Sequence, residues 1–507
     1  MYSYRNFLIA AALASVACGP EVVTTDTEAV PSTGADTGST GVPTTGVPMT
    51  GESTGEPMTS TTGDDTTTGD DTTTGSTVVT CVASPQDHGA ACPDPCPITV
   101  DLEIGCDDDR FGIYGLRVAP APDTTWLVTS SDDAALLFRA DAVDAVRQDV
   151  APEGFIDSGI VAALDPAGEL HLVADATQQP DYEGGLLHVA EADGWSPTLL
   201  FDPPSKYVDV LALEVSPEGT PMVWLETDPP DGHSLAVPDG QGGWQLDVAP
   251  SAGVSYRNYS LAANGLPVAA ALNSKDMLWY VLDGVKRQLS DELLSFTIPG
   301  VHYRLAYPPA PGAPLDVPQV ATALYDDDGL HVAWSLMDDG FEQVDFAGTQ
   351  APKLQCFFEW NGRGSCPKSA CLESAIGVER EAYSLARTGD GTLWLAVVTT
   401  TFDQTVVFTE MCRDDFGCFC DRETTLDLTR GELRLIRVAT DGTPPIEVFT
   451  LPIDDIDIEG TAGDGDTERV IDLRGFGDQL ALGVMTRPPG GAPAIRLLRI
   501  DTAQIAP

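Results

Sequence analysis

The acidic stretch "DDIDIEGTAGDGD" (454–466) carries side chains suited to holding a divalent cation. Asp455, Asp457 and Glu459 alternate before a glycine, and Asp466 occupies the twelfth position of a loop that starts at Asp455. Carboxylate oxygens followed by a sharp turn are typical of calcium-binding loops. The sequence therefore predicts calcium as a cofactor held by these four residues. The alternative is an acidic loop that contacts only solvent.

The chain has eleven cysteines, and their grouping indicates their roles. One stands alone, four follow in a short segment and six lie in the C-terminal part: Cys18; Cys81, Cys92, Cys96 and Cys106; Cys356, Cys366, Cys371, Cys412, Cys418 and Cys420. The ten after Cys18 form an even set, as a disulfide framework in an exported protein requires. We expect all ten to form disulfides, with zinc at Cys92 and Cys96 as the alternative. The spacing leaves the pairing open.

Common motifs of catalysis are absent from the sequence: there is no GxSxG, no HExxH and no phosphate-binding glycine loop. His171 and His331 occupy the same place in two repeats, which indicates a shared structural role. The stretch "TGDGTLW" (388–394) resembles the Asp-box of sialidase-like propellers, although it is one residue short. Because the Asp-box shapes a turn, this resemblance implies blade architecture rather than catalysis. The arginine cluster and the Tyr-Glu pair of a sialidase are not evident in the sequence.

The first seventeen residues have the pattern of a secretory signal peptide, with one arginine before an apolar run at 7–14. The run is too short to span a bilayer. Residues 15–17 fit an ordinary cleavage site, whereas residues 16–18 resemble the lipobox of bacterial lipoproteins, with Ser15 where that family usually has leucine. The lipobox resemblance implies that Cys18 carries a lipid. It would place the protein at the outer membrane or the cell surface, with the membrane as a partner.

The charge balance of 26 Lys plus Arg against 78 Asp plus Glu gives a formal net charge of −52. Such a surface repels DNA, RNA and anionic lipid headgroups, so we exclude nucleic acid as a partner.

Composition divides the chain into four parts. After the signal peptide (1–17), residues 18–80 consist mainly of Thr, Ser, Gly, Asp, Glu and Pro, with too few large apolar side chains to offset the entropy of ordering. They are predicted to be a disordered linker behind the lipid anchor. Residues 81–106 hold four cysteines and four prolines, and they are predicted to be a disulfide-stapled segment that leads into the main domain.

Residues 107–507 repeat one pattern, in which a short apolar strand, a turn with Gly, Asp or Asn, and a strongly apolar strand follow one another. The turns carry glycines at spacings of 51, 46, 64 and 62 residues: Gly168, Gly219, Gly265, Gly329 and Gly391. Four short strands per repeat and about seven repeats predict an all-β propeller of about seven four-stranded blades. Cys356, Cys366 and Cys371 lie in one insertion and Cys412, Cys418 and Cys420 in another, which indicates insertions that disulfides stabilise.

In pattern, residues 107–507 resemble extracellular β-propellers of bacterial surface lipoproteins. The sequence therefore predicts a surface-anchored, non-catalytic binding propeller that recognises an extracellular or envelope protein or a glycan, with the linker supplying reach. The alternative is a carbohydrate-active propeller enzyme that uses paired carboxylates. A central cleft with two carboxylates about 5 to 10 Å apart, one with a strongly raised pKa, would favour the enzyme. A third possibility is a structural component of the envelope.

Overall fold

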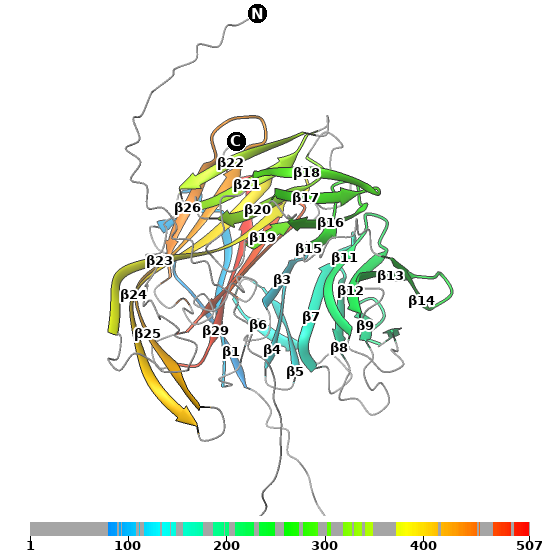
Figure 1. Cartoon of the computed structure of the whole chain (residues 1–507). Helices are drawn as coiled ribbons and strands as arrows, with labels where there is room; N and C mark the ends of the chain where they lie inside the picture. The colour runs from blue at the N-terminus through cyan, green and yellow to red at the C-terminus, as the bar shows by residue number, and fades with distance from the viewer. Residues whose placement is uncertain are drawn as a thin grey trace, which may run out of the picture. The chain divides into compact units, whose positions relative to one another are not determined.

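The structure is a computed structural model that describes residues 80–505, with its longer gaps at 176–185, 249–257, 293–301, 306–317, 348–371 and 457–469. The signal peptide and the linker predicted by the sequence lie outside the described residues, apart from Thr80. The described part is all-β and forms seven sheets (Figure 1). It contains no helix long and apolar enough to cross a membrane.

Six of the seven sheets are four-stranded antiparallel blades whose strands follow chain order, and the seventh is a four-stranded blade with a fifth strand at its edge. Blade one contains β3 (Leu116–Pro120), β4 (Thr125–Ser131), β5 (Ala134–Ala140) and β6 (Ala145–Gln148). Blade two contains β7 (Ile156–Leu164), β8 (Leu170–Asp175), β9 (Leu186–Ala190) and β10 (Thr198–Phe201). Blade three contains β11 (Val208–Val215), β12 (Pro221–Thr227), β13 (His233–Pro238) and β14 (Trp244–Val248). Blade four contains β15 (Asn258–Leu261), β16 (Pro267–Leu272), β17 (Met277–Leu282) and β18 (Val285–Glu292).

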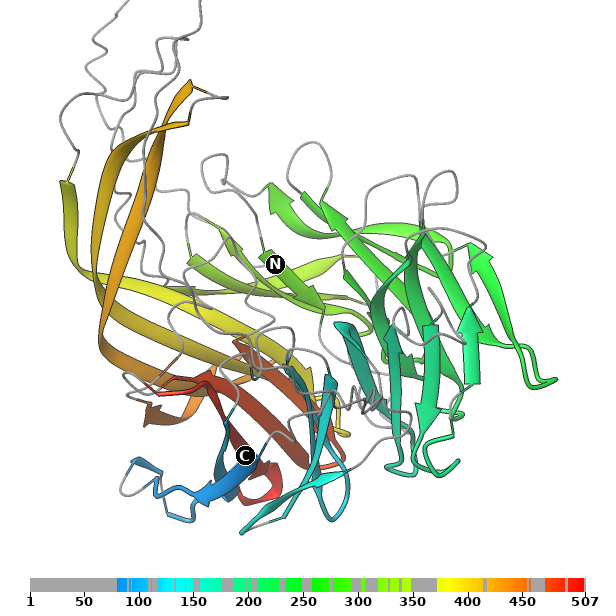
Figure 2. The ribbon, with the colours of Figure 1, turned by 90° about the horizontal axis from the view of Figure 1, so that it is seen from below.

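Blade five contains β19 (His302–Leu305), β20 (Ala321–Asp326), β21 (Gly329–Ser335) and β22 (Phe341–Ala347). Blade six contains β23 (Leu372–Arg387), β24 (Leu393–Arg413), β25 (Gly417–Val438) and β26 (Ile446–Pro452). Blade seven contains β27 (Ile471–Phe476), β28 (Gln479–Thr486), β29 (Ala494–Asp501) and β2 (Ile98–Cys106), with β1 (Cys81–Pro85) added at its outer edge. A 3-10 turn (Thr502–Gln504) follows β29. The first strand of each blade contacts that of the next around the whole ring, so the prediction of seven four-stranded blades is confirmed (Figure 2).

Blade seven closes the ring with a strand from the start of the propeller. β2 pairs antiparallel with β29, so that Leu102 lies opposite Leu497. The sequence-based boundary at residue 107 therefore moves to Ile98, because β2 belongs to the propeller and not to a separate stapled segment. Its apolar residues alternate and are buried, which is the pattern of a strand covered on that face: Ile98, Val100, Leu102 and Ile104.

The core of the described residues consists of seven apolar clusters, and each cluster joins two neighbouring blades. Between blades one and two, for example, Trp126 and Val128 pack with Leu170 and Leu172. A four-stranded sheet cannot bury its own faces, so each blade depends on both neighbours for its hydrophobic stabilisation. This dependence makes the ring a single cooperative unit, and it makes the contacts between the innermost strands sensitive to change.

The first turns of blades two, three, four and six share one geometry. In each, the N–H of the fourth turn residue donates to the carbonyl of the first at 2.8 to 3.0 Å. That fourth residue is a glycine with φ between 79° and 88°, a conformation that costs glycine little: Gly168, Gly219, Gly265 and Gly391. These are four of the five glycines whose spacing predicts the blades. The fifth, Gly329, begins β21 and pairs with Asp326, so blade five turns differently.

The turn of blade six is held by Asp390, as the resemblance to an Asp-box implies. Its carboxylate accepts hydrogen bonds from the Thr388 hydroxyl at 2.7 Å and from the Thr392 amide at 3.0 Å. The Trp394 indole N–H donates to the same Thr388 hydroxyl at 3.0 Å. Burial raises the pKa of Asp390, but the hydrogen bonds from Thr388 and Thr392 together hold it below its ordinary value. The motif therefore fastens the turn to the second strand of its blade.

Replacing Asp390 with alanine should lower the free energy of unfolding by about 2 kcal/mol, because several hydrogen bonds to a carboxylate are lost together. Urea unfolding followed by tryptophan fluorescence measures this change. The matched control is Glu218→Ala at the third position of the equivalent turn in blade three, where the Ser216 hydroxyl accepts the turn amides instead. Equal stability of the two variants would show that Asp390 does not hold its turn.

Blade six extends beyond the ring through its middle strands. β24 and β25 are 21 and 22 residues long, and they curve away from the other blades as a long hairpin (Figure 2). The second predicted insertion is this extension, and its backbone register sets Cys412 opposite Cys418 and Glu410 opposite Cys420. Cys356, Cys366 and Cys371, predicted to lie in the first insertion, are outside the described residues.

Candidate functional site

The candidate site is a hollow at one mouth of the central channel. Residues of the first strands and turns of blades one, two, three, four and seven line it, and its volume is about 660 Å³, including the part open to solvent. Its walls are about as polar as they are apolar, and Pro120, Pro166, Pro217 and Phe476 are among the apolar lining residues. A concave surface that brings several polar groups together is a candidate ligand site.

The turns around this mouth lie close together. A side chain added at Gly168 would come within 2.6 Å of Pro122, and one added at Gly265 would come within 2.6 Å of Pro217. In both places a glycine of one blade packs against a proline of the preceding blade. The rim of the hollow is therefore built from closely packed turns, which keeps its shape fixed.

The lining contains three charged residues, Asp165, Glu214 and Arg474, and two of them lie close to each other. Glu214, on β11, is buried, and its Oε1 lies 3.6 Å from Nη1 of Arg474 on β27. Burial raises the pKa of Glu214 to about 7; Arg474 and Arg117 oppose this rise and Asp472 adds to it. Glu214 is therefore a carboxyl group that exchanges its proton near neutral pH.

A second carboxylate completes the cluster. Asp472, also on β27, is fully buried, and its Oδ2 lies 3.6 Å from Nε of Arg474. The same oxygen accepts a 2.8 Å hydrogen bond from the Val118 amide of blade one. One guanidinium thus lies within ion-pair distance of carboxylates from blades three and seven. Such a cluster can bind a polar group, and Glu214 can give or take a proton there.

Sequence reasoning missed Glu214, Asp472 and Arg474. The signal was present, because each is a charged residue between apolar neighbours on a strand that starts a blade, as in "LEV" (213–215) and "DLR" (472–474). The pattern of alternating apolar residues in the sequence predicts the strands, but it does not say which of their side chains face the centre of the ring. Only closure of the ring brings these three side chains together.

The predicted calcium ligands Asp455, Asp457, Glu459 and Asp466 lie outside the described residues. Calcium at this loop therefore stays a prediction.

Four of the cysteines form two disulfides in the structure, Cys81–Cys106 and Cys92–Cys96. The first joins the paired ends of β1 and β2, and the second closes a tight loop between these strands. His88 lies beside the second, and its nitrogen and the two sulfurs lie within 4.8 Å of one another. With the sulfurs joined to each other, Cys92 and Cys96 are not thiolate ligands, so this state does not offer the zinc site that was the alternative.

The two histidines that share a repeat position, His171 and His331, are both buried, and neither lines the hollow. His171 Nδ1 lies 3.0 Å from His188 Nε2, and burial lowers the pKa of both, that of His188 to about 4. His331 Nδ1 lies 2.8 Å from the Asp345 carboxylate. These contacts link the second strand of a blade to its third, as a structural role requires.

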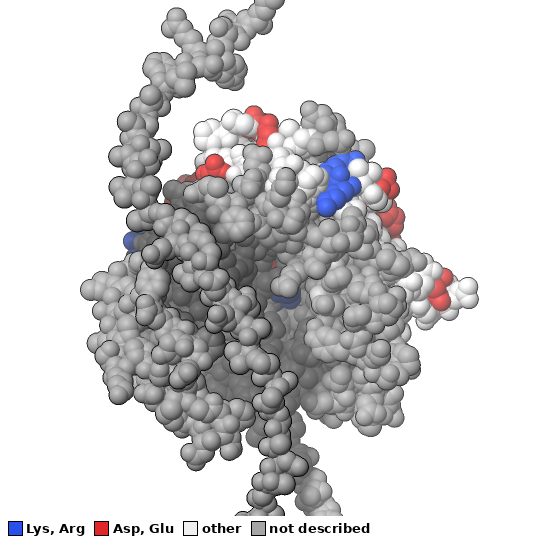
Figure 3. All heavy atoms as spheres, viewed as in Figure 1, with Lys and Arg blue, Asp and Glu red and all other residues white. Residues whose placement is uncertain are grey.

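The described acidic groups are not gathered at one place on the face drawn in Figure 3, where they lie at several separate positions.

No protein-family model matches the chain, and no curated protein matches it. Solved structures with a similar fold include a protein of unknown function from Dyadobacter fermentans, with 13% identity over 67% of this chain and 94% of that chain and a TM-score of 0.34. A virginiamycin B lyase from Staphylococcus aureus has 10% identity over 67% of this chain and 94% of that chain, with a TM-score of 0.29. A polysaccharide lyase has 11% identity over 76% of this chain and 90% of that chain, with a TM-score of 0.31. At these identities none of them assigns an activity to this chain.

Proposed function

We propose that this protein is a non-catalytic binding propeller that accepts a protruding group of a protein or glycan in the hollow at the channel mouth. The observation that carries the proposal is the hollow itself, which has a rim of closely packed turns and contains a charged pair, Glu214 and Arg474.

The charges in the hollow favour a neutral polar group. Arg474 donates hydrogen bonds, while Glu214 accepts them when ionised and donates one when protonated. The net charge of −52 repels anionic ligands before they reach the site. Sugar hydroxyls or the backbone and side-chain amides of a protein loop satisfy both conditions.

We extend the proposal to the location of this binding. A lipid on Cys18 would hold the chain at the outer membrane or the cell surface, and residues 18–80 would give the propeller reach toward extracellular ligands. Calcium held at the Asp454–Asp466 loop would be a structural aid to this binding.

Filling the hollow should abolish binding. Ala263 lines the hollow on the first turn of blade four, and Ala263→Trp should weaken ligand binding at least about tenfold, since a hollow occupied by an indole cannot admit the ligand group. The full chain carrying Cys18→Ser would be applied to arrays of glycans and of purified envelope proteins, with calcium and with chelator. Leu266→Trp is the matched control, because Leu266 is 40% exposed on the same turn and is not part of the lining. Unchanged binding by Ala263→Trp would refute this site.

A second candidate, a carbohydrate-active enzyme, is favoured by one observation. Glu214 has the raised pKa expected of a general acid, and Asp472 is held by the same arginine. Incubating bound glycans with the chain and measuring their length by mass spectrometry distinguishes the two functions. Shortened products that disappear with Glu214→Gln would establish the enzyme, whereas intact glycans support binding alone.

A further inference from the structure

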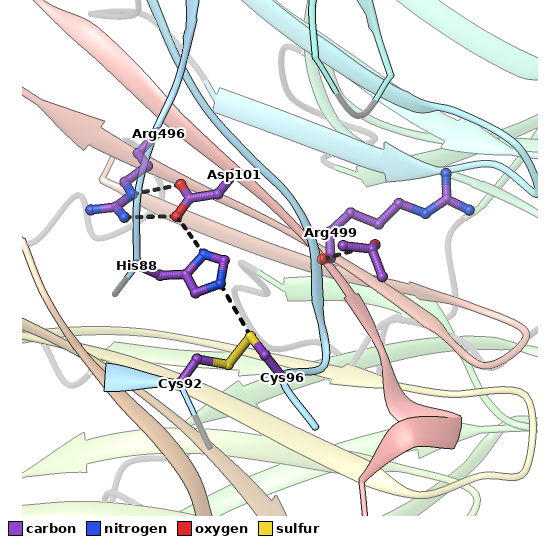
Figure 4. The surroundings of a disulfide bond; sticks show 7 residues. His88, Cys92, Cys96, Asp101, Arg496 and Arg499 are labelled. Carbon is purple, nitrogen blue, oxygen red and sulfur yellow. Dashed lines mark hydrogen bonds and ion pairs between the residues drawn. A yellow bond between two sulfur atoms is a disulfide. The ribbon is translucent and has the colours of Figure 1, made fainter. Parts of the chain in front are cut away.

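The loop between β1 and β2 places a histidine on one sulfur of a disulfide. His88 Nε2 lies 3.3 Å from Sγ of Cys96, which is joined to Cys92 (Figure 4). The other ring nitrogen, Nδ1, lies 3.5 Å from Oδ2 of Asp101 on β2. Asp101 is buried, and both of its oxygens accept hydrogen bonds of 2.9 Å from Arg496 on β29. These contacts link the paired strands β2 and β29 to the Cys96 sulfur through Arg496, Asp101 and His88.

The arrangement makes the two sulfurs chemically different. A sulfur that leaves a disulfide carries negative charge, and a neutral imidazole can donate one hydrogen bond from Nε2. A Cys96 thiolate would therefore have a hydrogen-bond donor at its side, which stabilises a thiolate. Cys96, and not Cys92, has this neighbour among the contacts of the described residues.

We propose that Cys92–Cys96 is a thiol–disulfide exchange site that accepts two electrons from a dithiol. This function goes beyond ligand binding in the channel. A thiolate of the dithiol attacks Sγ of Cys92; the bond between Cys92 and Cys96 breaks, and its electron pair leaves with Cys96 Sγ. A bond forms between the attacking sulfur and Cys92, while the Nε2–H of His88 stabilises the Cys96 thiolate.

The second thiol of the reductant, once deprotonated, completes the reaction. It attacks the sulfur that its own molecule has bonded to Cys92, and Cys92 leaves as a thiolate that takes up a proton. The dithiol is thereby oxidised to a disulfide, and Cys92 and Cys96 are reduced. A leaving thiol of lower pKa speeds exchange, which is the effect that His88 supplies.

The surroundings allow a partner to reach the bond. Cys92 and Cys96 are half-buried, and the His88 side chain is 27% exposed. Cys106 of the other disulfide is buried, at 5% exposure, and that bond lies between paired strand ends. Cys81–Cys106 therefore serves as an internal reference for the rate of exchange, because no histidine adjoins it among the contacts of the described residues.

The test is the rate at which the folded chain, carrying Cys18→Ser, is reduced by dithiothreitol at neutral pH. Samples are quenched with iodoacetamide, and the alkylated cysteines are identified by mass spectrometry. We expect Cys92–Cys96 to be reduced at least about tenfold faster than Cys81–Cys106, and His88→Gln to slow it about tenfold. The matched control, His331→Gln in blade five, should leave the rate unchanged.

Mapping the mixed disulfide tests the direction of attack. With glutathione as a monothiol probe, the adduct should form on Cys92 and leave Cys96 free for alkylation. An adduct on Cys96, or equal reduction rates in the parent and His88→Gln, would overturn the proposal. A reduced chain that holds one equivalent of zinc through His88, with no acceleration of exchange, would overturn it in favour of a metal site. Circular dichroism shows whether each variant retains the fold, and the exchange rate of His88→Gln is compared with the parent only if that variant is folded. If His88→Gln unfolds, the position of the glutathione adduct in the parent chain still decides between Cys92 and Cys96.

Discussion

Replacing Gly475 with alanine is expected to prevent stable folding of the propeller. A Cβ at this position would lie 1.9 Å from the carbonyl oxygen of Arg387 and 2.8 Å from its carbonyl carbon. Neither atom belongs to a flexible side chain. We expect a loss of about 3 kcal/mol or more in the free energy of unfolding, since overpacking against a backbone can be relieved only by separating the strands.

The strands in question cannot separate freely. Gly475 lies on β27 and Arg387 on β23, and these first strands of blades seven and six are joined where the Leu473 amide donates to the Ser384 hydroxyl at 3.0 Å. The Arg387 guanidinium is fully buried and donates to the Pro318 carbonyl of blade five. Burial lowers the pKa of Arg387 to about 9. A shift of β23 would therefore disturb three blades together.

Expression yield, circular dichroism and urea unfolding measure the effect of Gly475→Ala. Gly105→Ala is the matched control, because it also adds a methyl group to a strand of blade seven, and there the new Cβ would meet only Ala494 at an ordinary 3.8 Å. If both variants unfold at the same urea concentration as the parent, the close packing of β23 on β27 is not a requirement of the ring.

The strands and turns of each blade could be predicted from the sequence because they depend on residues that are close together in the chain. A glycine with positive φ terminates the same four-residue turn in several blades, so its spacing reports the blade repeat. The strand β2 shows the limit of this reasoning. Its alternating apolar residues were present at Ile98 to Ile104, but four nearby cysteines suggested a separate segment, and only pairing with β29 reveals it as part of a blade.

The candidate site could not be predicted because its residues come from distant parts of the chain. Glu214 and Arg474 lie on blades three and seven, and they meet only because the innermost strands converge on one channel. The sequence did supply the criterion for recognising an enzyme, a pair of carboxylates with one raised pKa. Glu214 and Asp472 meet part of that criterion, since both lie 3.6 Å from Arg474 and burial raises the pKa of Glu214 to about 7.

The raised pKa of Glu214 has a consequence for stability that Glu214→Gln isolates. The folded chain keeps the Glu214 proton up to about pH 7, whereas the unfolded chain loses it near the ordinary value of 4.5. Between these pH values the folded state binds more protons than the unfolded state, so this residue's contribution to the free energy of unfolding falls as the pH rises from 4.5 to 7 and is level above. The difference corresponds to roughly 3 kcal/mol.

Glutamine has no proton to lose, so Glu214→Gln should lack this decline. Urea unfolding at intervals from pH 4.5 to pH 8 measures it, and subtracting the parent curve from the variant curve removes the contribution of the other acidic residues. We expect the difference to change by roughly 3 kcal/mol in favour of the variant as the pH rises. Glu218→Gln, an exposed acid on the adjoining turn, should give a curve parallel to the parent. If the curve for Glu214→Gln is also parallel to the parent, Glu214 is ionised in the folded protein across this pH range. That result would remove the observation that favours an enzyme. Glu214 and Arg474 would then be a fixed ion pair in a binding site.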